Sequence, residues 1–177
     1  EIIQMWKGGM SFHGGLIGVA FSSFIFSKKN KMDFLRLTDI VACSAPIGLF
    51  FGRIANFING ELYGKASTLP WSVIFPMGGN ISRHPSQLYE SLLEGIILFA
   101  IINFIALKNR TILRTGSISS LFLIFYSILR IIGETFREPD QHLGYFFNFI
   151  SMGTALSVIT LIVGLLMLYK KNYEKNI

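Results

Sequence analysis

The chain alternates between long apolar runs and short polar connections. A helix needs about 20 predominantly apolar residues to cross the roughly 30 Å hydrocarbon core of a bilayer. Five runs approach that length, near residues 10–27, 40–58, 87–107, 116–136 and 144–169, and the last contains ALSVITLIVGLLMLY without a charge. The pattern predicts an all-α polytopic membrane protein with five transmembrane helices, forming a single transmembrane domain over residues 1–177.

A small outer segment is predicted between the second and third runs. Residues 60–84 contain Pro70, Pro76, Gly78 and Gly79, which are typical of turns and loops. Within this segment the stretch LPWSVIFP is rich in residues that favour strands. It predicts either a short strand or an interfacial segment.

The composition supports a membrane protein. Hydrophobic residues make up 51% of the chain and charged residues 15%, against roughly 25% charged residues in an average soluble domain. This excludes a free-standing soluble enzyme. Cys43 is the single cysteine, so an intrachain disulfide is excluded, and we expect Cys43 in the core rather than as a nucleophile. With no Cys/His cluster at zinc spacing, we expect no metal site.

The basic residues indicate an orientation. A net charge of +6 would suit nucleic acid if the basic residues shared one face, but they follow the loops, so no nucleic-acid partner is expected. Lys and Arg in short loops stay cytoplasmic, which predicts an outer N-terminus and a cytoplasmic C-terminus. The inner group is Lys28, Lys29, Lys31, Arg36, Lys108, Arg110, Arg114, Lys170, Lys171 and Lys175.

Four polar residues in different runs are predicted to share one depth. At a rise of 1.5 Å per residue, Arg53 lies roughly 20 Å and Arg130 roughly 21 Å from the inner ends of their runs. Glu94 and His13 lie roughly 10 Å and 4 Å below the outer ends of theirs. An arginine near mid-bilayer costs about 2.5 to 3.5 kcal/mol on insertion scales, so this layer is a functional-site candidate.

The fourth run carries a polar face. Tyr126, Arg130, Glu134 and Arg137 follow helical spacing, so a phenol, a carboxylate and two guanidiniums line one side of a helix. Two interpretations stay open. Glu134 neutralises its neighbours in an intramembrane ion-pair strut, or the face forms part of a binding site.

Arg53 has no acidic residue at helical spacing. Its helical neighbour Asn56 orients but does not neutralise, so the sequence favours an anionic ligand, and a guanidinium suits a phosphate. Glu90 and Glu94, one turn apart, either cap a helix start or balance the arginines. His13 is either a hydrogen-bonded core residue or a catalytic one, and Gly14 after it allows a close approach of a helix or ligand.

Four stretches carry a family resemblance: SFHGGLIG, GRIANFINGELYG (52–64), RHPSQLYESLLEG (83–95) and the series from Tyr126 to Arg137 with its REPD end. They resemble the prolipoprotein diacylglyceryl transferase family over nearly the whole chain. Ala55, Tyr63 and Lys65 stand where the family commonly has Gly, Trp and Arg, mild changes that affect packing and rim contacts. The resemblance implies seven spans in a complete member, and we expect this chain to begin near the third.

The resemblance implies an enzyme of the bacterial inner membrane. It would transfer the sn-1,2-diacylglyceryl group from phosphatidylglycerol to the lipobox cysteine of a prolipoprotein on the outer side, forming a thioether and releasing glycerol phosphate, without a cofactor. The implied catalytic residues are His13, Arg53, Tyr126, Arg130 and Glu134. The implied substrate-binding residues are Gly14, Arg53, Asn56, Glu61, Gly64 and Arg137.

Within that resemblance, Arg53 and Arg130 are expected to hold the leaving phosphate, and His13 is a candidate base for the thiol, although an arginine-rich field also favours thiolate. Glu61 and Gly64 are expected to shape the outer rim. Two other classes remain as alternatives: an anion transporter or channel, and a non-catalytic lipid-binding scaffold. Crowding of polar residues in the outer half speaks for a one-sided site.

Overall fold

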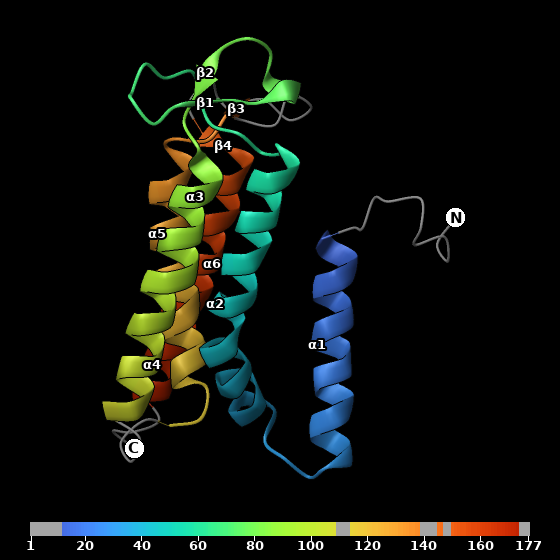
Figure 1. The fold of residues 1–177 in the computed structure, drawn as a ribbon. Helices are drawn as coiled ribbons and strands as arrows, with labels where there is room; N and C mark the ends of the chain where they lie inside the picture. Colours follow the sequence, from blue (N-terminus) through green and yellow to red (C-terminus); the bar gives the residue numbers. More distant parts are fainter. Residues whose placement is uncertain (1–11, 109–113, 139–144, 147–149, 174–177) are drawn as a thin grey trace.

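The structure is a computed structural model that describes residues 12–108, 114–138, 145–146 and 150–173, without the side chains of residues 12–17, 145, 146, 150 and 171–173. In this part of the chain, four helical spans are long and apolar enough to cross a membrane, and they form the bundle in Figure 1. This confirms a mostly helical, polytopic membrane architecture. The spans are α2 (Phe34–Asn59), Ser86–Lys108, α5 (Ser117–Glu134) and α6 (Met152–Tyr173).

The first apolar run folds as α1 (Phe12–Lys29), which ends at two lysines. Helix α1 is not among the four spans found by length and hydropathy in the described part. Figure 1 shows it standing apart from the bundle, and its Phe24 ring meets Phe34 at the start of α2 with ring centroids 6.1 Å apart. A fifth crossing therefore stays a prediction.

Helix α2 begins six residues before the predicted run, because a polar cap starts it. The Asp33 side chain accepts hydrogen bonds from the backbone N–H groups of Leu35 and Arg36, which satisfies donors that the first turn leaves open. Gly60 ends the helix in the left-handed region, with φ of 70°, a conformation that glycine adopts without strain.

The span Ser86–Lys108 changes its helical geometry on the way. It consists of α3 (Ser86–Glu90), the π-helix η3 (Ser91–Ile97) and α4 (Leu98–Lys108). A π-helical stretch, with its i→i+5 hydrogen bonds, has more residues per turn than an α-helix and is frequent at functional sites. The predicted limits, residues 87–107, differ from this span by one residue at each end.

The prediction of a helix from residue 144 is wrong at its beginning. Residues Tyr145–Phe146 (β3) pair antiparallel with Ile150–Ser151 (β4), and α6 starts only at Met152. The stretch is apolar enough to form either a helix or a strand, and the antiparallel pairing of β3 with β4 makes it a strand pair. Ser151 then caps α6, because its hydroxyl accepts a hydrogen bond from the backbone N–H of Thr154 at 3.2 Å.

A small β-structure covers one end of the bundle. Val73–Ile74 (β1) pair antiparallel with Ser82–Arg83 (β2), so the strand interpretation of LPWSVIFP is confirmed. Isolated bridges join Gly64 to Arg137 and Ala66 to Arg83. The chain that follows α2 is thereby fixed to the chain that follows α5, and Figure 1 shows this cap above the helices.

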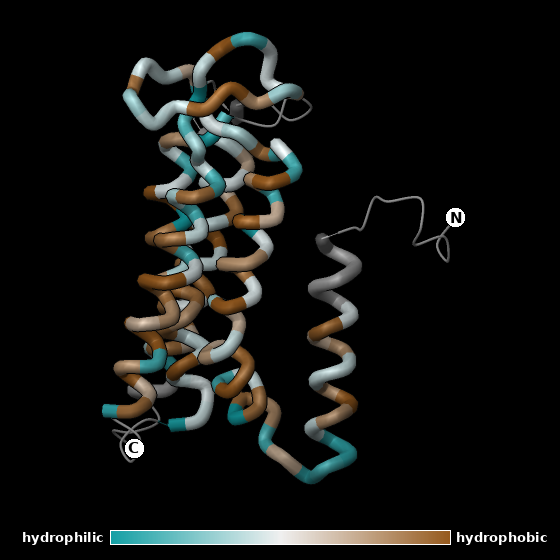
Figure 2. The backbone as a smooth tube through the Cα atoms, in the orientation of Figure 1, coloured by the Kyte–Doolittle hydropathy of each residue, from teal (hydrophilic) through white to brown (hydrophobic). Residues whose placement is uncertain are grey.

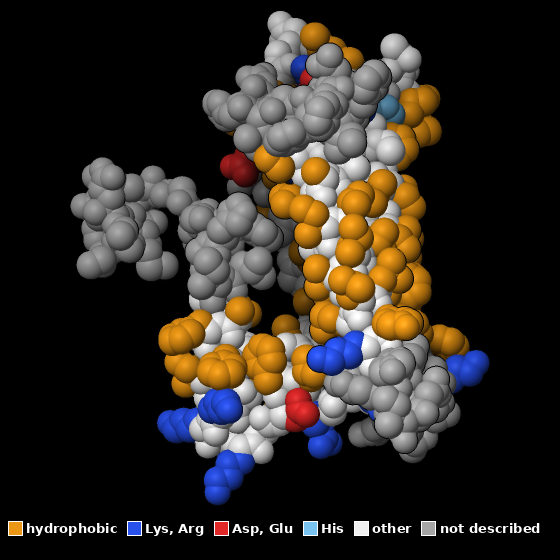
Figure 3. All heavy atoms as spheres, turned by 180° about the vertical axis from the view of Figure 1, so that it is seen from behind, with side chains coloured by type: hydrophobic (Ala, Val, Ile, Leu, Met, Phe, Trp, Pro, Cys, Tyr) orange, Lys and Arg blue, Asp and Glu red, His pale blue; other side chains and the backbone are white. Residues whose placement is uncertain are grey.

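Apolar side chains divide between a small core and a wide outer surface. The buried core contains Ala42, Leu98, Ile102, Ile118 and Leu129. Figure 2 shows hydrophobic residues along the lengths of the helices, and Figure 3 shows apolar side chains covering the helices on the face that it draws. Lys and Arg side chains gather at the end away from the cap in Figure 3. This is the pattern that lipid contact requires.

Candidate functional site

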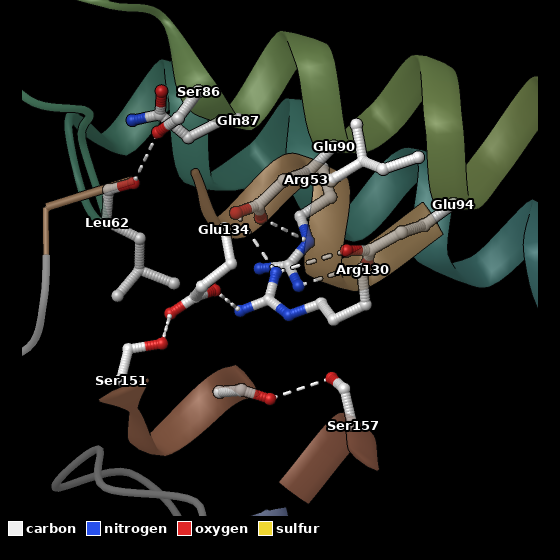
Figure 4. Close-up of polar contacts among 12 residues, drawn as sticks. Arg53, Leu62, Ser86, Gln87, Glu90, Glu94, Arg130, Glu134, Ser151 and Ser157 are labelled. Atoms are coloured by element: carbon white, nitrogen blue, oxygen red, sulfur yellow. Dashed lines mark hydrogen bonds and ion pairs between the residues drawn. The ribbon is translucent and has the colours of Figure 1, made fainter. Parts of the chain in front are cut away.

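Five charged side chains from three spans form a buried cluster, which we call the charged layer: Arg53, Glu90, Glu94, Arg130 and Glu134. Arg53 comes from α2, the first two glutamates from α3 and η3, and the last two residues from α5. Figure 4 shows these side chains pointing toward one another between the helices.

Two glutamates bridge the two guanidiniums. Glu90 contacts Arg53 Nε at 2.9 Å and Arg130 Nη1 at 3.0 Å, through different carboxylate oxygens. Glu94 contacts Arg53 Nη2 at 3.2 Å and Arg130 Nη1 at 3.1 Å. Because each carboxylate holds both arginines, neither guanidinium moves without disturbing the other.

Glu134 holds Arg130 from a third side. Its Oε2 lies 2.8 Å from Arg130 Nη2, one helical turn away on α5. The intramembrane ion pair that the spacing suggested is therefore confirmed. The same contact leaves the binding-site interpretation open, because a paired arginine still donates through its remaining N–H groups.

Burial makes this pairing necessary. The side chains of Glu90 and Glu94 are 0% exposed, that of Arg130 is 9% exposed and that of Arg53 is 14% exposed. An ion removed from water costs several kcal/mol, and the cost is offset only when partners of opposite charge lie within contact. Of the two guanidiniums, that of Arg53 is slightly more exposed.

Glycines let the spans approach closely enough to form the layer. A Cβ on Gly95 would lie 2.7 Å from Phe50 Cβ, and one on Gly133 would lie 3.2 Å from Glu90 Cγ. The first contact brings η3 against α2 three residues before Arg53, and the second brings α5 against Glu90. Close helix contacts at small residues are typical of membrane bundles.

Helical rise predicted that Arg53, Arg130, Glu94 and His13 share one layer, and the structure brings the first three together. The interpretation of Arg53 as uncompensated is wrong. Its acids lie on a neighbouring helix, at positions 90 and 94, where spacing within its own helix gives no signal. Of the two roles weighed for these glutamates, balancing the arginines is the one observed. Neither was among the proposed site residues.

The remaining predicted residues of α5 lie near the layer. Tyr126 is half-buried one turn before Arg130, and its ring stacks on Phe122 with centroids 5.8 Å apart. Its hydroxyl makes no hydrogen bond with a described residue, which leaves it available to a ligand. Arg137 is buried, and its backbone forms the bridge with Gly64.

Three predicted residues lie in the last turn of α2 or in the connection after it. Asn56 is half-buried, and its backbone oxygen accepts the Glu61 N–H at 2.9 Å. The Glu61 side chain is exposed, while its backbone oxygen accepts a hydrogen bond from Gln87 Nε2 at 2.6 Å. A Cβ on Gly64 would lie 2.5 Å from the His84 backbone oxygen, so the close bridge requires glycine.

His13 and Gly14 belong to α1, but their side-chain positions lie outside the described residues. Their roles stay predictions. Cys43 is half-buried and packs against the apolar core, as expected of a core residue. Within the described residues, no grouping of three or more His, Cys, Asp or Glu side chains is suited to a metal ion.

Comparison with known proteins gives the family. A family model described as prolipoprotein diacylglyceryl transferase matches residues 1–170. The chain belongs to the prolipoprotein diacylglyceryl transferase family. The matched region includes every residue of the charged layer.

Individual relatives agree with this family assignment. The phosphatidylglycerol–prolipoprotein diacylglyceryl transferase of Rickettsia bellii is 52% identical over 170 residues, which cover 96% of this chain and 65% of the relative. The enzyme of the same name from Zymomonas mobilis is 48% identical over 165 residues, covering 93% of this chain and 58% of the relative. The chain thus spans less than two thirds of these transferases.

Chemically, the charged layer holds the guanidiniums of Arg53 and Arg130 in fixed positions between carboxylates. Nη1 of Arg53 and Nε of Arg130 make no ion pair with a described residue, whereas their other nitrogens are held by carboxylates. Fixed donors with unused N–H groups bind an anion without first reorganising. The layer as a whole combines two guanidiniums with three carboxylates, so these unused N–H groups are the part of it at which an anion would find a donor.

Proposed function

We propose that the complete protein transfers the sn-1,2-diacylglyceryl group from phosphatidylglycerol to the lipobox cysteine of prolipoproteins, the first step of lipoprotein maturation. Family membership supports the reaction class. The single structural observation that carries the proposal is the pair of guanidiniums, Arg53 and Arg130, held together by two buried glutamates. A phospholipid headgroup is an anion that reaches this depth.

In the reaction, the cysteine sulfur forms a bond to the glyceryl carbon, and the bond from that carbon to the phosphate oxygen breaks. The electron pair of the broken bond stays with the phosphate, which leaves as glycerol phosphate. Arg53 and Arg130 stabilise this growing charge, an effect worth several kcal/mol in a site that excludes water. Glu90 and Glu94 keep both guanidiniums in place and are positioning residues.

The other predicted residues receive roles around this centre. His13 accepts the thiol proton, Glu134 orients Arg130, and Tyr126 donates a hydrogen bond to the lipid headgroup. Asn56 and Arg137 bind the headgroup glycerol and phosphate, and Gly14 allows the lipid to approach His13. Glu61 and Gly64 form the rim where the lipobox peptide enters. No cofactor takes part, because the carbon–oxygen bond of the phospholipid is itself the donor.

The protein would lie in the bacterial inner membrane with five spans in this chain and seven in the complete protein. The charged layer and its cap would face the periplasm, and the C-terminus the cytoplasm. The gathering of Lys and Arg at the end opposite the cap supports this orientation through the positive-inside rule. A small periplasmic segment would then correspond to the cap.

The test uses the complete protein in detergent with labelled phosphatidylglycerol and a lipobox peptide. A peptide mass increase by one diacylglyceryl group, with equimolar release of glycerol phosphate, is the expected result. A peptide with its cysteine replaced by serine is the control. Lipid binding without a mass change would point to a scaffold, and anion flux into vesicles without a mass change would point to a transporter. Either result would overturn the proposal.

A further inference from the structure

The beginning of α6 lies directly against the charged layer. Ser151, which caps this helix, is buried, and its hydroxyl donates a hydrogen bond to Glu134 Oε1 at 2.9 Å. The Ser151 Oγ also accepts a hydrogen bond from the Thr154 N–H at 3.2 Å. These two bonds fix the hydroxyl, and Figure 4 shows Ser151, just before α6, pointing at Glu134, which in turn points at Arg130.

Gly153 provides the space for the same carboxylate. A Cβ on this glycine would lie 2.6 Å from Glu134 Oε1, 2.7 Å from Cδ and 2.8 Å from Oε2. The Glu134 carboxylate therefore rests on the backbone of the first turn of α6, in a place that any side chain would fill. The N-terminal end of a helix also carries a partial positive charge, which favours a carboxylate there.

A second glycine of α6 shows what ordinary packing looks like. A Cβ on Gly164, three turns further along, would lie 3.0 Å from Leu123 Cβ, from Ile124 Cγ1 and from the Ser120 backbone oxygen. Gly164 therefore allows close packing of α6 on α5 without touching a charged group. The two glycines share a helix and a tight contact with α5, and they differ in what they contact.

From these contacts we propose that Ser151 and Gly153 are positioning residues of the transferase site. They form a seat for the Glu134 carboxylate. Glu134 holds Arg130 at 2.8 Å, so the seat fixes the direction of the guanidinium that meets the donor phosphate. This inference rests on the proposed function, because it assigns the seat to the binding and turnover of an anionic lipid.

The first experiment compares Gly153→Ala with Gly164→Ala in the complete protein, using the transfer assay and a thermal unfolding scan in detergent. Gly153→Ala is expected to lower kcat/KM for phosphatidylglycerol about a hundredfold, because a displaced arginine no longer meets the phosphate. Gly164→Ala is expected to lower the unfolding temperature while kcat/KM stays within about threefold. Equal losses of kcat/KM in both variants would overturn the proposal.

Ser151 gives a separate check. Ser151→Ala is expected to lower kcat/KM about tenfold, as the loss of one positioning hydrogen bond does. Ser151→Thr keeps the hydroxyl and is expected to recover most of that loss. A threonine variant as poor as the alanine variant would contradict a role for the hydrogen bond.

A measurement without turnover separates the seat from the proposed function. In a Glu134→Ala background the carboxylate is gone, so Gly153→Ala has room and is expected to leave the unfolding temperature unchanged. In the protein that keeps Glu134, Gly153→Ala is expected to lower the unfolding temperature. Gly164→Ala is expected to lower the unfolding temperature equally with and without Glu134. If the wild-type protein transfers nothing, the proposed function fails, yet this comparison still decides whether Gly153 acts through Glu134. Equal effects of Gly153→Ala in both backgrounds would show that it does not.

Discussion

Both ends of the bundle hold carboxylates that join helices, but the partners of those carboxylates differ. At the end away from the cap, half-buried Asp39 of α2 accepts hydrogen bonds from the backbone N–H groups of Gly116 and Ser119, both at 2.7 Å, and from the Ser119 hydroxyl. It caps α5 from another helix. In the charged layer, Glu90 and Glu94 contact guanidiniums instead.

The difference teaches what each end does. The donors around Asp39 are neutral groups at the start of α5, and a cap of this kind stabilises the helix that begins there. The donors around Glu90 and Glu94 are cations with unused N–H groups, and a buried ion pair contributes little net stability after desolvation. The first arrangement stabilises the fold, whereas the second holds two guanidiniums with N–H groups that no described carboxylate contacts, which are the groups that the proposed function uses.

The sharpest way to break this comparison is to remove a cation. Arg53→Ala or Arg130→Ala in the complete protein is expected to lower thioether formation about a thousandfold or more, because the phosphate charge is no longer stabilised. Membrane insertion is expected to persist, since the apolar spans are unchanged. Peptide mass spectrometry measures the loss, and near-normal transfer by either variant would remove that arginine from the mechanism.

A smaller effect is expected when a bridging carboxylate is neutralised. Glu94→Gln keeps the side-chain shape but removes the charge between the two arginines, and we expect kcat/KM to fall about a hundredfold as the guanidiniums separate. Steady-state kinetics with phosphatidylglycerol measures it. The matched change at the other end is Asp39→Asn, and similar kinetic losses in both variants would contradict the comparison.

His13 is expected to matter less, and in a pH-dependent way. Without a base, the reaction depends on thiolate that forms spontaneously, and a free cysteine has a pKa of about 8.5. His13→Gln is therefore expected to lower the rate about tenfold or more near pH 7 and to approach the wild-type rate as the pH rises above 9. A pH–rate profile checks this. A variant with the wild-type rate throughout the profile would make His13 structural.

The smallest kinetic effect belongs to the structural carboxylate. Asp39→Asn weakens the cap of α5 and is expected to cost about 1–3 kcal/mol of stability, with kcat/KM unchanged at a temperature where the protein is folded. Thermal unfolding measures the loss of stability, and the transfer assay on the same preparation measures kcat/KM. Ser119→Ala removes one of the donors and is expected to act in the same direction to a smaller extent.

The sequence predicted the spans that are marked by apolar length, and it missed limits set by polar contacts or pairing. Asp33 extends α2 by capping it, and Ser151 pairs in a hairpin where apolar composition alone favoured helix. Strand and helix are both compatible with a short apolar stretch, so hydropathy does not separate them there.

The charged layer was half predictable. Rise per residue gave the common depth of Arg53, Arg130 and Glu94, because distance along a helix axis depends only on counting. Which side chains face each other depends on rotation about the axis and on glycine contacts such as that of Gly95 with Phe50. Counting does not supply these, so the partners of Arg53 were found only in the folded chain.

The π-helix η3 makes the site sensitive to an error of a single residue. Glu90 precedes it and α4 follows it, so the length of this segment sets the rotation between them. Deleting one residue within 91–97 would leave the span apolar and long enough to insert, yet it would change the rotation of Glu90 about the helix axis relative to α4. Judged by hydropathy alone, such a protein would look intact, although Glu90 would no longer lie between Arg53 and Arg130.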